Sequence, residues 1–272
     1  MSEKNSFALK LRYSGDTVTE KGLDLYDGAT SFQGFSQALQ IVVHAYLRNE
    51  VVSRATALKG AELFFSSPKK GSVLFDIIAV IEAYPATVAV GAAPFYDFIK
   101  LCFSKAIGLV DVVPDTNYVS KLNTKDEPFF DAVAEQIEGP LQRGHRCFDS
   151  GVSSITLERP RSPLVTFNSA SRDWVNTRDE NPDAIPFTGN MTRYNSITGN
   201  GRAYIQQLKR IVPIRPAQEF PFNKKGYLTW SLHGSNVDTN KDLVFTAKRI
   251  ESARGEVKRL VLLDCESASE SA

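Results

Sequence analysis

Alternating and helical hydrophobic patterns divide the N-terminal part of the chain into short elements. Residues 7–13 (FALKLRY) alternate apolar and polar side chains without a break, which predicts a half-buried strand. Residues 22–26 (GLDLY) predict a weaker second strand. A helix is then expected to begin at Thr30, which has capping-box spacing to Gln33, and to end near Asn49.

A hairpin and a helix are expected next. Residues 61–67 and 73–81 are apolar runs on either side of the loop PKKGS, a pattern that predicts two antiparallel strands. From Pro94 onward, apolar residues recur at helical spacing, and Asp97 lies on the opposite, polar face. The order strand, strand, helix, hairpin, helix predicts an α+β fold.

Small side chains are concentrated in the most apolar stretch of the chain, residues 71–113. They predict a close-packed seam, within the fold or between subunits, at Ala86, Ala89, Gly91 and Ala93. The longest uncharged run, residues 83–96, has 14 residues, which is shorter than the roughly 18 that a membrane span needs. We therefore expect a homo-oligomer or multi-protein complex without membrane contact, and keep an oligomeric membrane-acting effector as an alternative.

The middle of the chain predicts a helix, two short strands and a domain boundary. The helix spans residues 128–137, and the following Gly139-Pro140 should end or bend it. The strands cover residues 153–157 and 164–167, and a polar segment bracketed by prolines follows at 176–186. The expected domains are an α+β domain at 1–180, a small barrel at 186–265 and a disordered tail at 266–272.

The C-terminal third predicts five strands with a short helix between the third and the fourth. The helix covers residues 228–232 (LTWSL), and Asn200-Gly201 marks a tight hairpin between the first two strands. Three strands, a helical connection and two strands is the order of an OB-fold, so we expect a five-stranded OB-like barrel. The strands are expected at residues 187–196, 202–205, 210–214, 242–250 and 256–264.

Charge is unevenly distributed along the 272 residues. The formal net charge is +1, but residues 186–264 carry +7 and the preceding 185 residues carry −4. A basic barrel beside an acidic domain predicts contact with nucleic acid or with an acidic protein. The candidate contact residues are Arg193, Arg202, Tyr204, Lys209, Arg210, Lys248, Arg249, Lys258 and Arg259.

Catalytic patterns are weak in this sequence. Asp242, Glu256 and Lys258 imitate the acid and E-x-K pattern of metal-dependent nucleases, but the two acids are expected at the rim of the barrel. His145 beside Cys147 could indicate an activated thiolate, although the chain offers no clear partner for a dyad. We expect no catalytic residue, metal or cofactor, and keep a metal-dependent nuclease as the alternative.

Cysteine usage and the N-terminus bear on the compartment. Three widely spaced cysteines argue against a disulfide framework and for a reducing environment. The start, MSEKNS, has no apolar run behind a basic end, so a signal peptide is not expected. Both observations predict a cytoplasmic protein.

Two resemblances support the barrel and a binding role. Residues 189–195 (GNMTRYN) followed by residues 199–205 (GNGRAYI) resemble the opening hairpin of cold-shock domains, whose strand faces stack single-stranded bases. Arg193 and Asn200 stand where that family carries stacking aromatics. The whole chain resembles an uncharacterised bacterial two-domain family with a small barrel containing L-T-W-S-L-H, here residues 228–233. That resemblance implies an accessory or antiviral-defence component, and we expect a non-enzymatic binding or assembly protein.

Overall fold

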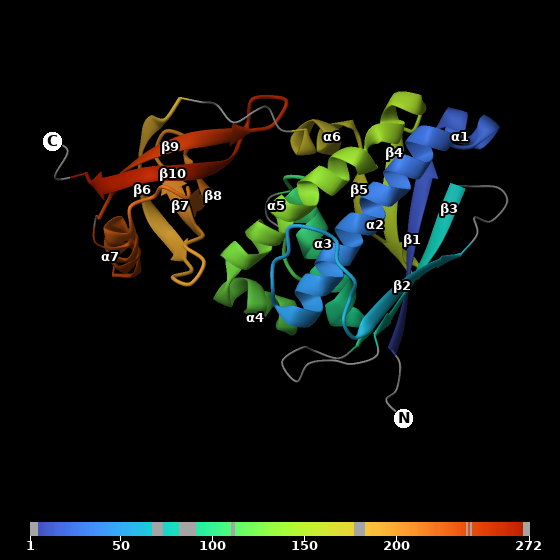
Figure 1. The fold of residues 1–272 in the computed structure, drawn as a ribbon, viewed down its shortest axis with the longest axis horizontal. Coiled ribbons are helices and arrows are strands. Elements are labelled where there is room, and N and C mark those ends of the chain that lie inside the picture. Colours follow the sequence, from blue (N-terminus) through green and yellow to red (C-terminus); the bar gives the residue numbers. More distant parts are fainter. Residues whose placement is uncertain are drawn as a thin grey trace. The chain divides into compact units, whose positions relative to one another are not determined.

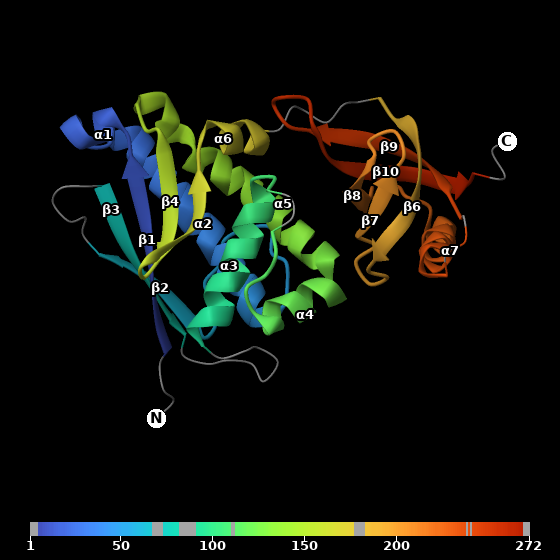
Figure 2. The same ribbon diagram turned by 180° about the vertical axis from the view of Figure 1, so that it is seen from behind.

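The computed structural model divides the chain into two compact units, which are described separately. Unit 1 comprises residues 1–124 and 130–176, and unit 2 comprises residues 125–129 and 177–272. Figures 1 and 2 label the helices and strands from opposite sides. The structure describes residues 5–66, 73–81, 91–109, 112–176, 183–237, 239 and 241–268.

Unit 1 contains a five-stranded antiparallel sheet in the order β2-β3-β1-β4-β5. Helix α5 begins among the residues grouped with unit 2 and continues through unit 1. The elements are β1 (Asn5–Ser14), α1 (Asp16–Lys21), α2 (Leu25–Arg48), β2 (Ala61–Ser66), β3 (Val73–Ile81), α3 (Ala92–Ala106), α4 (Asn117–Lys125), α5 (Glu127–Gly144), the 3-10 turn η1 (Arg146–Ser150), β4 (Ser154–Arg159), β5 (Ser162–Phe167) and α6 (Ser169–Val175).

Helices α2 and α3 cover the same face of this sheet. Phe95 of α3 stacks on Phe7 of β1, and Phe35 of α2 meets Phe167 of β5 edge-on, each pair with ring centroids 4.8 Å apart. The registers of β1, β4 and β5 place Phe7 and Phe167 on one side of the sheet. Ala8, which points to the other side, is exposed. Successive side chains of β1 therefore point in turn to the hydrophobic core and to the surface.

The main elements predicted from periodicity in unit 1 are confirmed. The apolar positions of β1 are buried, and β2 pairs with β3 as an antiparallel hairpin. The α+β class is confirmed as well. In α3 the predicted stripe is buried at Phe95, Phe98, Ile99, Cys102, Phe103 and Ala106.

The predicted start of α2 at Thr30 is wrong. Residues 22–26 do not form a strand, and α2 begins five residues before Thr30. Asp24 is the N-cap, because its side chain accepts a hydrogen bond of 2.9 Å from the backbone N–H of Asp27. The predicted end holds, with Asn49 in the left-handed conformation at φ 53°.

Asp97 is buried on α3, which corrects its predicted place on a polar face. Its relative exposure is 2%, and its two oxygens accept hydrogen bonds from the backbone N–H groups of Asp115 and Thr116, both at 2.8 Å. The hydroxyl of Thr116 donates to it at 2.6 Å. The carboxylate therefore satisfies the backbone donors that precede α4, which compensates for its burial.

Helix α5 continues through Pro140, so Gly139-Pro140 does not end the helix. The helix extends to Gly144. Ile137 and Leu141, on either side of the proline, are both fully buried. We attribute the continuation to this packing, which offsets the loss of one helical hydrogen bond.

Gly34 allows α2 and α5 to approach each other closely. A β-carbon at this position would overlap the Pro140 carbonyl oxygen and the Gly144 amide nitrogen, which are backbone atoms. Alanine normally favours a helix over glycine by up to about 1 kcal/mol. Here we expect Gly34→Ala to destabilise unit 1 by about 1–3 kcal/mol, because backbone cannot yield as a side chain can.

Urea unfolding checks this prediction, with Gly139→Ala as the matched control. Gly139 is also helical, but a β-carbon there would meet nothing within 4 Å. The control should cost less than Gly34→Ala, because its β-carbon crowds only the ring of the following Pro140. Equal effects of the two substitutions would contradict the close approach of α2 and α5.

Unit 2 contains a closed five-stranded barrel, as predicted, in the order β10-β8-β7-β6-β9. All neighbouring strands are antiparallel except β8 and β10, which are parallel. When the strands are numbered one to five in chain order, this is the strand order of an OB-like barrel. The elements are β6 (Ile185–Tyr194), β7 (Gly201–Ile205), β8 (Arg210–Pro216), the 3-10 turn η2 (Phe222–Lys224), α7 (Lys225–Asn236), β9 (Leu243–Glu251) and β10 (Val257–Ser267).

The first barrel hairpin has a longer connection than predicted. Residues 195–200 separate β6 from β7, and the left-handed glycine is Gly199 (φ +79°). The Asn195 side chain accepts from the N–H groups of Ile197 (3.0 Å) and Thr198 (3.2 Å), which closes a side-chain turn before Asn200-Gly201 is reached.

The predicted seam lies mostly outside the described residues, where Ala86 and Ala89 fall. Gly91 is half-buried at φ +128°, and a β-carbon there would meet nothing within 4 Å; Ala93 is exposed. These two positions are therefore not close-packed within unit 1. Across the part of the chain that the structure describes, no helix has the length and apolar character of a membrane span.

Candidate nucleic-acid interface

The outer face of β7 and β8 carries two large exposed side chains next to each other. Tyr204 is directly opposite Ile211 in the antiparallel pair, and the two are 38% and 44% exposed. Their chain neighbours Ala203, Ile205 and Val212 are fully buried inside the barrel. Since side chains alternate across a strand, the register that fills the barrel core also places this pair outside.

Two exposed cations lie around this pair, one on β6 and one in the turn between β7 and β8. Lys209 lies in the turn between β7 and β8 with φ 52°, and its N–H donates to the Gln206 carbonyl at 3.3 Å. Arg193 is exposed on β6, where a bulge follows Met191, and it pairs in register with Arg202. A ring, an aliphatic side chain and exposed cations on one barrel can contact bases and phosphates.

Other predicted cations have partners within unit 2. Arg202 forms an ion pair with Glu127, and Arg249 contacts Glu251 at 3.2 Å. Arg210 donates to the Val257 carbonyl oxygen, and burial lowers the pKa of its guanidinium. These side chains contribute less free charge to a ligand than the sequence predicted.

Two predicted contact residues of β10 are buried. Lys258 and Arg259 are 4% and 9% exposed, so we leave them out of the candidate surface. Lys248 is half-exposed on β9. Of the candidate residues, the structure therefore exposes Arg193, Tyr204 and Lys209 most clearly.

Ile211 belongs to the surface but was missed by sequence reasoning. The alternation of β8 could have found it, because Val212 and Ile214 are inside the barrel and Ile211 must then point outward. The pairing with Tyr204 then places the two side chains next to each other on the same outer face.

The nuclease-like residues do not converge. Asp242 precedes β9 and accepts a hydrogen bond of 2.8 Å from Gln206, whereas Glu256 follows the far end of the same strand. Nine strand residues separate them, or about 30 Å of extended chain. They cannot bind one ion together. Among the described residues, no three His, Cys, Asp or Glu side chains are grouped in a way that could bind a metal.

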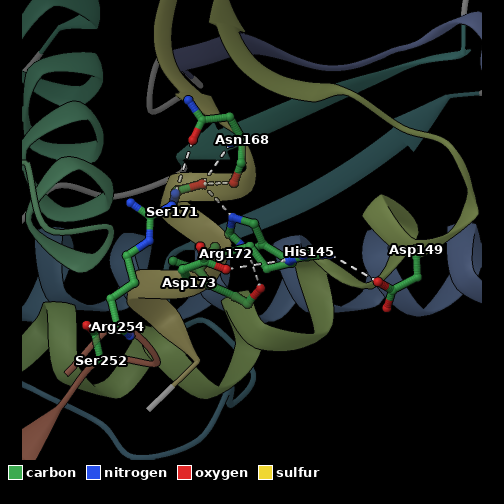
Figure 3. Close-up of polar contacts among 9 residues, drawn as sticks. His145, Asp149, Asn168, Ser171, Arg172, Asp173, Ser252 and Arg254 are labelled. Atoms are coloured by element: carbon green, nitrogen blue, oxygen red, sulfur yellow. Dashed lines mark hydrogen bonds and ion pairs between the residues drawn. The ribbon is translucent and has the colours of Figure 1, made fainter. Parts of the chain in front are cut away.

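The His145–Cys147 hypothesis also fails, because both side chains are buried in unit 1. Figure 3 shows His145 in a polar network with Ser171 and Asn168. His145 Nδ1 donates to the Leu141 carbonyl at 2.7 Å, and Nε2 accepts from the Ser171 hydroxyl at 2.8 Å. Ser171 in turn forms a capping box with Asn168 at the start of α6. Burial raises the pKa of Cys147 to about 11, which disfavours a thiolate.

A comparison with family models identifies the larger part of the chain. Residues 9–176 match the model described as a domain of unknown function (DUF7946). The chain belongs to this family. The match covers the α+β fold of unit 1 and ends before the barrel strands. Searches of curated proteins and of solved structures found no match.

Proposed function

We propose that this member of the DUF7946 family is a non-enzymatic binding protein whose barrel contacts single-stranded nucleic acid. The observation that supports the proposal is the exposed Tyr204–Ile211 pair on β7 and β8. In an OB-fold, the face of the second and third strands is the one that binds oligonucleotides. By chain order, β7 and β8 are these strands.

The chemistry of the face favours an unpaired strand. A base can stack on the Tyr204 ring and contact the Ile211 side chain, and base–aromatic stacking contributes about 1–3 kcal/mol per base. Lys209 and Arg193 would pair with phosphates. Bases in a duplex are already stacked, so a duplex can use only the charges.

Binding of a labelled single-stranded oligonucleotide tests the proposal. We expect Tyr204→Ala to weaken binding about tenfold, since one stacked base is lost. Lys209→Glu combined with Arg193→Glu should weaken binding and reduce its dependence on salt between about 50 and about 200 mM. Fluorescence anisotropy with DNA and with RNA measures both effects.

Lys121→Glu combined with Lys59→Glu is the charge-matched control. Lys121 on α4 and Lys59 in the loop before β2 are exposed lysines of unit 1, so reversing both changes the net charge by as much as the Lys209/Arg193 reversal without changing the proposed face. Wild-type protein that binds neither oligonucleotide at low salt would overturn the proposal. So would equal losses from the control and from the Lys209/Arg193 reversal.

A further inference from the structure

Two exposed rings, Phe222 of η2 and Trp230 of α7, lie between β8 and β9 in the sequence, together with the half-buried ring of Tyr227. Three aromatic rings each have a lysine ammonium near the ring face: Lys225 over Phe222 at 4.9 Å, Lys224 over Tyr227 at 5.4 Å, and Lys241 over Trp230 at 5.3 Å from the centroid. We call these six residues the α7 patch. Tyr227 and Trp230 are three residues apart, so they are neighbours on one side of the helix.

Barrel packing accounts for Tyr227, which packs against the core, but not for Phe222 and Trp230. α7 is attached through its buried residues Leu228, Ser231 and Gly234. The Ser231 hydroxyl accepts a hydrogen bond of 3.0 Å from the Met191 N–H of β6. Phe222 is 82% exposed, so its ring contributes little to the core. Phe222 and Trp230, each with a lysine ammonium near its ring, are therefore available to a partner.

The charges of the patch favour a polyanion. Residues 222–236 contain two lysines and no acidic residue. Lys224 is 3.5 Å from Asp264, which offsets part of its charge. Lys225 and Lys241 add cations close to Phe222 and Trp230. An anionic chain that also carries flat groups would use both the ammonium groups and the rings.

We propose that the α7 patch is a second contact surface for single-stranded nucleic acid, with Phe222 and Trp230 stacking bases and Lys225 and Lys241 pairing with phosphates. The inference rests on the proposed function and extends it, because it adds an aromatic surface outside the second and third strands. It also names the part of the ligand that is recognised at this surface, the unpaired base.

Trp230 provides its own spectroscopic signal. We expect an oligothymidylate of about 20 nucleotides to quench its fluorescence. Trp230→Ala and Phe222→Ala should each weaken binding about tenfold. Trp230→Phe should keep most of the affinity, because a ring remains, but should lose the quenching. Asn236→Ala, an exposed change at the end of α7, should leave binding unchanged.

An abasic oligonucleotide of equal length separates stacking from charge. Trp230→Ala should not weaken its binding, since it has phosphates and no bases. If Trp230→Ala and Phe222→Ala bind oligothymidylate like wild type while Tyr204→Ala is weakened, the α7 patch is wrong and the proposed function stands. If wild type binds no oligonucleotide at low salt, both are wrong. Equal losses with the abasic strand would overturn base stacking at the patch.

Discussion

Replacing Gly189 with alanine is expected to unfold the barrel or destabilise it by about 3 kcal/mol or more. Gly189 is the residue of β6 that pairs both with Ile205 of β7 and with Leu243 of β9. β6 therefore pairs with β9 up to Gly189 and with β7 from Gly189 onward. A β-carbon here would overlap the Tyr204 carbonyl oxygen, which is part of the β7 backbone. Only glycine fits this approach of two strands.

Fluorescence of Trp230 reports unfolding of unit 2 when Trp174 is replaced by phenylalanine, since Trp174 lies in unit 1. Gly226→Ala is the matched control. Gly226 lies in α7, and a β-carbon there would meet nothing within 4 Å, so this change should be neutral or stabilising by up to about 1 kcal/mol. A Gly189→Ala protein as stable as wild type would contradict the close approach of β6 and β7 at this residue.

Unit 1 is expected to lose about 3 kcal/mol of stability as the pH falls from about 6.5 to about 4, because of one histidine. Burial lowers the pKa of His145 to about 4, and its side chain is 1% exposed. The unfolded chain binds the proton near its ordinary value of about 6.5. Between these values the unfolded state takes up more protons, so stability is complete above pH 6.5 and decreases below it.

His145→Gln tests this dependence, because glutamine can accept from Ser171 but does not titrate. Urea unfolding of unit 1, followed by Trp174 in a Trp230→Phe background, should depend less on pH between about 6.5 and about 4 in the variant. His233→Gln serves as the control, since His233 is exposed on α7 in unit 2. An unchanged pH dependence in His145→Gln would contradict a neutral, buried His145.

The sequence predicted elements whose periodicity comes from a single buried face. The alternation of β1 and the stripe of α3 could be read because each faces one core. The start of α2 was missed because residues 22–26 have the apolar and polar alternation of a strand, although Asp24 is of a residue type that caps helices. Asp97 was misplaced because its burial depends on backbone donors at 115–116, which local pattern does not reveal.

The candidate site shows the same limit. Tyr204 could be named from its strand, but its contact with Ile211 required the register of β7 with β8. Lys258 and Arg259 were expected outside because charges usually are. β10 has a register shift between Val257 and Arg259, and residues 257–262 are all buried. A bulge of this kind breaks the alternation from which the exposed face of a strand is inferred.

The parallel pairing of β8 with β10 has a consequence for the order in which the barrel can form. The β6–β7–β8 meander pairs neighbours in sequence, so it needs only short loops to close. The strand that completes the ring, β10, is the last of the five to be synthesised, and its contact with β8 spans α7 and β9. Closing so long a segment is slow. Until then the nascent meander has two open edges, and the growing chain is most prone to mispairing there.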